Sequence, residues 1–293
     1  YHYIGCQSTI LKPNLYFLPK FPRDNTDRNR TSPFAFTGNK FEFRMVGAAS
    51  SIADANTVLN SSVAESLRVF ADRLEGAENL KTALHELIKE TVKKHKRIVF
   101  NGNGYDQRWL KEAVEKRGLK NYRTTPDCLP RLMDKKNVDM LTRHGVYTEA
   151  EIRSRYEIMT GNYCKTVMIE ASTMVDIART LIAPAVEAYA ADVAKAAAAK
   201  KALDPAISCS YETRLVRKLS ALTDRIASKT EELNNALFAL QNVEDVGTKA
   251  VMIRDNLLNL MGELRLACDE AETITARSYW PFPTYAELLY CAG

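Results

Sequence analysis

The sequence predicts a mainly α-helical protein with a small α+β part at its N-terminal end. Residues 1–50 hold most of the aromatic residues, prolines and turn formers of the first third of the chain, which is typical of strands and loops. From Ile52 onward, apolar residues recur with the spacing of helices. In the last third, leucines and isoleucines recur every three or four residues, as in the seam of a coiled coil.

Three helices are predicted after the strand-rich start, over residues 52–74, 78–96 and 107–116, the last ended by Gly118. The second helix ends in the basic run Lys93–Arg97. Cations are favoured near a helix C-terminus by the macrodipole, so we interpret this run as a solvated helix end. Contact with a polyanion is the alternative.

The two glycines of Asn101–Tyr105 are arranged in a way that suggests a phosphate-binding loop. A P-loop needs GxxxxGK[ST] and a dinucleotide loop needs GxGxxG after a strand, and neither pattern is complete here. We therefore expect a plain turn at this position.

Long antiparallel helices are predicted over about 148–202, 210–241 and 247–277. Thr148 and Glu151 form a capping box at the start of the first, and Pro184 should kink or break that helix. The other two carry heptad seams, which favour a packing or oligomerisation bundle without chemistry of its own. The seam residues are Leu215, Leu219, Leu222, Ile226, Leu233, Leu237, Leu240, Ile253, Leu257, Leu260, Leu264, Ala267 or Cys268, Ala271 and Ile274.

Composition excludes several classes of protein. A hydrophobic content of 46% and a charged content of 26% indicate a soluble globular chain. The 41 basic and 36 acidic residues are too balanced to indicate a nucleic-acid binder. The most apolar stretch, 174–191, contains three charged residues, so no membrane span is expected.

The six cysteines are scattered and never lie near the four histidines, which argues against zinc sites and suggests a reducing compartment. The chain begins at Tyr1, and its opening segment lacks the pattern of a signal peptide, so we expect a processed chain or a fragment. We expect the protein in the cytoplasm, or in an organelle if the source is eukaryotic.

Residues 40–44 alternate between charged and aromatic side chains. In a strand, Lys40, Glu42 and Arg44 share one face while Phe41 and Phe43 point into a core. Two cations beside one carboxylate suit an anionic substrate together with a divalent metal. A salt-bridged edge strand is the alternative, because charge on an exposed sheet face is common.

The segment that contains these residues, NRTSPFAFTGNKFEFR at 29–44, resembles the signature of type III glutamine synthetases. The resemblance covers about residues 22–290. Residues 1–18 do not resemble the sequence expected there. The further matching stretches are Asn56–Asn60, Phe100–Tyr105, Arg117–Leu119, Thr125–Asp127, Ile169–Met174 and Tyr279–Tyr285.

The resemblance implies a reaction and roles for four residues. In this family ATP phosphorylates the side-chain carboxylate of glutamate, ammonia displaces the phosphate, and Mg²⁺ or Mn²⁺ ions span the phosphates. Glu42 then corresponds to a metal ligand on the nucleotide-phosphate side. Arg44 corresponds to a catalytic arginine that contacts glutamate and the transferring phosphoryl group, and Arg30 to one that stabilises charge on the phosphate. Lys40 occupies a nucleotide-binding position that is arginine in type I enzymes.

Two departures from the family pattern limit what the chain is expected to do. A further phosphate-contacting arginine of type I enzymes has no counterpart within 31–37. The family's other metal ligands, several glutamates and a histidine, precede the matched region, as does an N-terminal domain. Because one carboxylate cannot hold a two-metal site, we expect the 293-residue chain alone to be inactive.

We therefore expect residues 1–75 to be the last part of a glutamine synthetase catalytic domain, and 76–293 to be a helical C-terminal region. The expected function is ligation of ammonia to glutamate through a γ-glutamyl phosphate, and the alternative is a truncated, non-catalytic assembly subunit. The implied partners are glutamate, ammonia, ATP and further copies of the chain in stacked rings, with no nucleic acid and no membrane.

Overall fold

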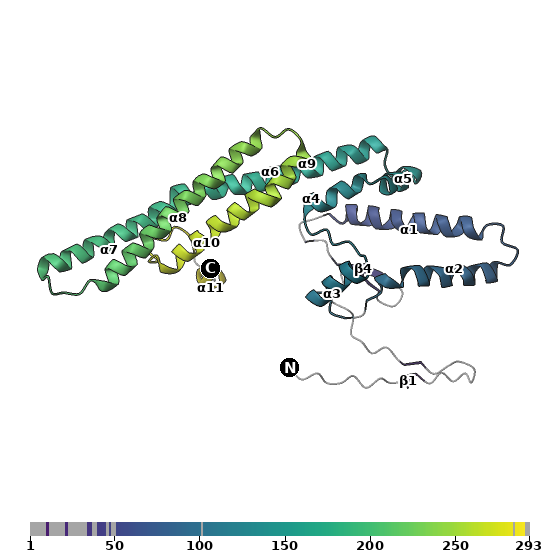
Figure 1. Ribbon diagram of the computed structural model, residues 1–293, viewed down its shortest axis with the longest axis horizontal. Coiled ribbons are helices and arrows are strands. Elements are labelled where there is room, and N and C mark those ends of the chain that lie inside the picture. Colours follow the sequence, from purple (N-terminus) through teal and green to yellow (C-terminus); the bar gives the residue numbers. More distant parts are fainter. Residues whose placement is uncertain are drawn as a thin grey trace. The chain divides into compact units, whose positions relative to one another are not determined.

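The computed structural model describes residues 10–11, 21–22, 34–36, 40–44, 47, 51–100, 102–283 and 285–290 (Figure 1). The described chain is mainly helical, which confirms the predicted fold class, and its strands are all short. The chain divides into two compact units. The first comprises residues 1–121 and 140–146, and the second comprises 122–139 and 147–293.

The strands of the first unit form two small antiparallel sheets. β1 (Ile10–Leu11) pairs with β2 (Phe21–Pro22), and β3 (Phe34–Phe36) pairs with β4 (Phe41–Phe43). In the second sheet Ala35 lies opposite Glu42. This register places Glu42 at the centre of the hairpin.

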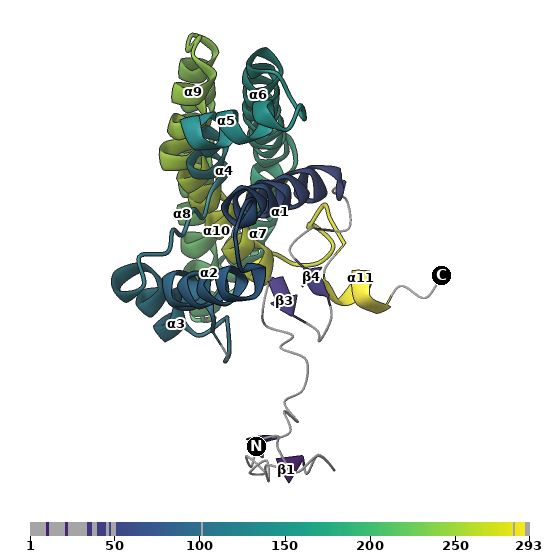
Figure 2. The ribbon, with the colours of Figure 1, turned by 90° about the vertical axis from the view of Figure 1, so that its right-hand side faces the viewer.

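The first two predicted helices are confirmed as α1 (Ala53–Leu74) and α2 (Leu80–His95), which lie side by side (Figures 1 and 2). Gly76, at φ +75°, allows the chain to reverse between them. The side chain of Asn79 accepts a hydrogen bond from the Thr82 N–H and caps α2. Across the hairpin, Arg73 pairs with Glu90 at 2.6 Å.

The third predicted helix is confirmed, although it begins as α3 (Gln107–Lys111) and ends in the π-helical turn η2 (Glu112–Lys116). Before it come η1 (Lys96–Ile98) and a turn in which the Asp106 N–H donates to the Asn103 carbonyl, so the prediction of a plain turn is also confirmed. Gly118, at φ +64°, follows the helix as predicted.

Short helices connect the first helices to the long ones. They are α4 (Thr125–Cys128), the 3₁₀ helix η3 (Leu129–Met133) and α5 (Lys135–Arg143). Pro126 lies in the first turn of α4, where a missing backbone N–H costs nothing.

The long helices make up the second unit. They are α6 (Glu149–Ile177), α7 (Ala183–Leu203), α8 (Ser210–Gln241), α9 (Val246–Met252) and α10 (Leu258–Ile274), with α11 (Tyr285–Tyr290) after them. The predicted capping box is confirmed at the start of α6. Thr148 Oγ1 accepts from the Glu151 N–H at 3.2 Å, and the Glu151 carboxylate accepts from the Thr148 N–H at 2.8 Å.

The predicted break at Pro184 does not occur, although the regular α-helix is interrupted just before this residue, and the kink stays a prediction. The π-helical turn η4 (Ala178–Ile182) leads directly from α6 into α7, and Pro184 lies in the first turn of α7. Proline has no N–H to donate and its ring crowds the preceding turn of an α-helix. The wider π turn just before it lets the helix continue.

The core of the second unit lies where α6, α7, α8 and α10 pack against one another (Figures 1 and 2). The predicted seam residues of α8 and of η5 (Ile253–Leu257) with α10 are all buried or half-buried. Short connections join α7 to α8 and α8 to α9, so α8 runs back along α7, and α9 with α10 runs back along α8. The supercoiling of a true coiled coil stays a prediction. In the part of the chain that the structure describes, every helix is too short or too polar to span a bilayer.

Leu264 and Leu266 of α10 test this packing as a matched pair, since the first is 1% exposed and the second 63% exposed. We expect Leu264→Ala to lower the free energy of unfolding by about 2–5 kcal/mol, because it removes buried methyl groups and leaves a cavity. Leu266→Ala should change it by only about 0.5 kcal/mol. Urea denaturation followed by circular dichroism measures both, and equal losses would contradict the assigned core.

Candidate functional site

The β3–β4 hairpin brings together three of the predicted site residues. Arg44 donates from Nε and Nη2 to Glu42 Oε2, at 3.2 and 2.8 Å. Lys40 Nζ lies 3.8 Å from Glu42 Oε1. The side chains of Glu42 and Arg44 are half-buried, whereas Lys40 is exposed. Arg30, the other predicted catalytic arginine, lies outside the described residues.

The prediction that Phe41 and Phe43 lie in a core is wrong for this chain. Phe41 is 61% exposed and Phe43 is 43% exposed. Both lie near Phe34, whose ring stacks on that of Phe41 at 5.0 Å between centroids and meets that of Phe43 edge-on at 6.4 Å. A hairpin of two three-residue strands has no second layer of its own, so its aromatic side chains contact one another but stay open to solvent.

Glu42 supplies one carboxylate at this cluster, and both of its oxygens face cations. Among the described residues, no three His, Cys, Asp or Glu side chains come close enough together to hold a metal ion. Magnesium requires an octahedral set of oxygen ligands. The described residues therefore do not form a metal site by themselves. What the cluster does provide is a planar guanidinium and an ammonium group, which suit a carboxylate or phosphate.

A second charged cluster, which the sequence did not predict, surrounds Glu65 of α1. Its carboxylate accepts from Arg68 one turn along α1, from Arg143 Nη1 at 2.5 Å, and lies 2.8 Å from His144 Nε2. The hydrogen bond from Arg68, aided by those of His144 and the charge of Arg143, lowers the pKa of Glu65 from 4.5 to about 2 against the opposing effect of burial. All of its partners are protein groups, so this cluster fastens residues 143–144 to α1.

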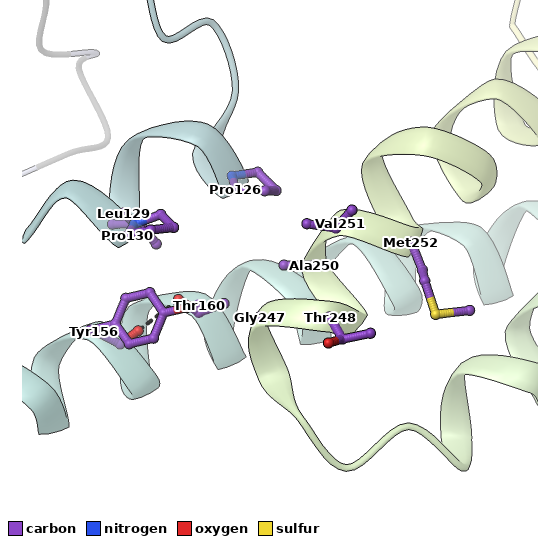
Figure 3. Close-up of a pocket in the computed structure, with 10 residues that line it drawn as sticks. All are labelled: Pro126, Leu129, Pro130, Tyr156, Thr160, Gly247, Thr248, Ala250, Val251 and Met252. Carbon is purple, nitrogen blue, oxygen red and sulfur yellow. Dashed lines mark hydrogen bonds between the residues drawn. The ribbon is translucent and has the colours of Figure 1, made fainter. Parts of the chain in front are cut away.

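An apolar pocket of about 410 Å³ lies in the second unit, between α4 with η3, α6 and α9 (Figure 3). Asp127 fastens one wall, because it accepts hydrogen bonds from Arg254 Nη1 and Thr124 Oγ1, both at 2.6 Å. No predicted site residue lines this pocket, and neither does any charged side chain. Its lining is Pro126, Leu129, Pro130, Tyr156, Thr160, Gly247, Thr248, Ala250, Val251 and Met252.

The stretch Phe100–Tyr105 is explained by packing. The Phe100 ring stacks on Trp109 at 3.8 Å, and the Arg117 guanidinium lies 4.8 Å from the Trp109 ring. A Cβ on Gly102 would lie 2.7 Å from the Phe100 ring, so a larger residue there would require this ring to move. Arg117 also donates to the carbonyls of Arg97 and Val99, which ties the end of η2 to the chain just before Phe100.

Comparison with known proteins shows which family this chain is similar to. Residues 83–201 match the family model of the glutamine synthetase C-terminal domain. The chain is 38% identical over 275 residues to a glutamine synthetase of Butyrivibrio fibrisolvens, an alignment that covers 92% of this chain and 39% of the relative. The chain is therefore similar to the C-terminal portion of glutamine synthetases.

Within that family the chain resembles the C-terminal portion of the type III enzymes, as predicted from its motifs. It is 34% identical over 282 residues to the type-3 glutamine synthetase of Dictyostelium discoideum. This alignment covers 93% of this chain and 38% of the relative. A glutamine synthetase of Bacteroides fragilis is 28% identical over 292 residues, with coverages of 97% and 40%. The chain thus spans about 39% of the length of the curated relatives it matches.

The Glu65 cluster predicts a defined dependence on pH. Because the pKa of Glu65 is lowered on folding, the stabilisation is complete above the unfolded value near 4.5 and is lost as the pH falls from there towards 2. In an NMR titration of the Glu65 carboxyl carbon, we expect Arg68→Gln to move the midpoint up towards 4.5. Arg108→Gln is the control: Arg108 pairs with Asp106, so its substitution should leave the midpoint of Glu65 unchanged. A wild-type midpoint near 4.5 would contradict the cluster.

Proposed function

We propose that this chain is part of an enzyme that ligates ammonia to L-glutamate at the expense of ATP, through a γ-glutamyl phosphate. The observation that carries the proposal is the contact of Lys40, Glu42 and Arg44 on one hairpin, within the segment that resembles the type III signature. The relatives named glutamine synthetase support the reaction class.

The proposed roles follow from the chemistry of each side chain. The Arg44 guanidinium can bind two oxygens at once, so we assign it to the substrate carboxylate and the transferring phosphoryl group. Lys40, an exposed point charge, is assigned to the nucleotide phosphates. Arg30 is assigned to charge on the transferred phosphate. Glu42 is assigned as one of several ligands to Mg²⁺ or Mn²⁺, in a set that other parts of the whole enzyme would complete.

The packing of the first unit supports the proposal that further protein covers it. Among its described residues, the buried apolar side chains are few, and two of the four are alanines: Ala35, Leu87, Ala113 and Leu141. One face of α2, by contrast, exposes apolar side chains at every fourth position, namely Leu80, Leu84, Ile88 and Val92. A row of exposed apolar side chains on one helix face suits contact with another part of a protein. We propose that the remainder of a full-length enzyme covers it.

We extend the proposal to organisation and assembly. Residues 1–75 would complete the catalytic domain and 76–293 would form the helical region of a homo-oligomer in stacked rings. The described cysteines at 128, 164, 209 and 268 are free thiols, which suits a reducing compartment such as the cytoplasm.

A non-catalytic assembly subunit is the second candidate. Its supporting observation is the closed core of the second unit, which a chain of this length can build by itself. The intact mass of the protein from its source separates the two candidates. A mass far above 32.9 kDa supports the ligase, and a mass near 32.9 kDa supports the assembly subunit.

Glutamine formation from glutamate, ammonia, ATP and Mg²⁺ tests the catalytic assignment. We expect a strongly helical circular-dichroism spectrum and no product from the 293-residue chain, because one carboxylate cannot organise the metal ions of the reaction. In the full-length enzyme, Glu42→Ala should lower turnover roughly 100-fold or more. Glu86→Ala, at an exposed acid on α2, is the matched control. Product from the 293-residue chain, or near-normal turnover of Glu42→Ala at saturating Mg²⁺, would refute the assignment.

A further inference from the structure

A second hollow, open to solvent and of about 610 Å³, lies where α7 turns back into α8. One wall comes from the last turn of α7 and the other from the first turns of α8. Positions 210, 213, 214 and 217 share one face of α8, since they are three, four and seven residues apart. The lining residues are Lys201, Cys209, Ser210, Thr213, Arg214 and Arg217.

Among the described residues, the two arginines of α8 at this hollow differ from the other cations of that helix, because no carboxylate pairs with them. Lys218 pairs with Glu270 at 3.1 Å, and Arg225 pairs with the same carboxylate at 3.8 Å. Lys229 pairs with Glu232 and Glu263 at 2.7 and 2.9 Å. Arg214 and Arg217 have no such partner among the described residues. Lys201 donates to a carbonyl, that of Pro205, at 2.8 Å.

The acidic residue of the first turn of α8 is paired away from these cations. Glu212, in the first turn of α8, is only 7% exposed, and its carboxylate pairs with Lys200. It does not line the hollow. Three positive charges therefore face one concave surface with no negative charge among its lining residues. The three side-chain charges matter more here than the N-terminus of α8, because a helix N-terminus contributes only about half a unit of positive charge.

We propose that this hollow binds a small molecule that carries a phosphate group. Two arginines one turn apart offer paired N–H donors that match the oxygens of a phosphate, and the hydroxyls of Ser210 and Thr213 add donors at the same wall. The charge of a phosphate balances three cations better than a single carboxylate does. The unpaired cations end at Arg217, since Lys218 and Arg225 are paired, so the surface suits a compact ligand better than an extended polyanion. This inference does not depend on the proposed function.

Isothermal titration of the 293-residue chain with inorganic pyrophosphate tests the proposal. We expect saturable binding, weakened about tenfold or more by Arg214→Gln and by Arg217→Gln, because each loses hydrogen bonds from a charged group. Lys218→Gln and Arg225→Gln remove the same charge from the same helix at paired positions, and they should change the affinity less than about twofold. Circular dichroism checks that each variant is folded.

Three results would overturn the proposal. One is the absence of saturable binding of pyrophosphate, and another is an equal loss of affinity in the Lys218→Gln and Arg225→Gln variants, which would reveal only general attraction. The third is tighter binding of succinate or of a short glutamate peptide than of pyrophosphate. That result would assign the surface to a carboxylate ligand or to an acidic protein segment.

Discussion

Burial of the apolar seam between the long helices is the interaction on which the second unit depends. Leu219, Ile226 and Leu233 of α8 are fully buried, as are Ile253 and Leu257 of η5. Burying side chains of this size stabilises by about 1.5–3 kcal/mol each, which offsets the entropy lost when long helices are ordered. This closed core keeps the end of α7 and the start of α8 together, so the hollow beside them is preformed.

The first unit, by contrast, buries few large apolar side chains, and its charged cluster is incomplete as a metal site. Local hydrogen bonds suffice to form α1, α2 and the β3–β4 hairpin, but most of their large apolar side chains stay exposed. The charged cluster at Glu42 is assembled, yet a single carboxylate is not a metal site. In the proposed enzyme, other protein would supply further ligands and cover Phe41 and its neighbours. The proposed ligase activity would then be a property of a larger assembly.

Features that depend on neighbouring residues were predictable from the sequence, and features that depend on distant ones were not. The capping box of Thr148 and the seams of α8 and α10 follow from spacing alone. The alternation of residues 40–44 correctly predicts that Lys40, Glu42 and Arg44 meet, because side chains two apart share a face. It cannot show whether a second layer covers the other face. Two of the partners of Glu65, Arg143 and His144, lie 78 and 79 residues away, so no local pattern reveals them.

Hydrogen exchange of the backbone amides, measured by mass spectrometry on the 293-residue chain, tests most directly the contrast between the two units. Exchange requires local opening, which is rare in a packed core and frequent in helices with few buried contacts. We expect the amides of α8 and α10 to exchange far more slowly than those of α1 and α2. Equal protection of all four helices would contradict the account, because it would mean that the first unit is as stable by itself as the second.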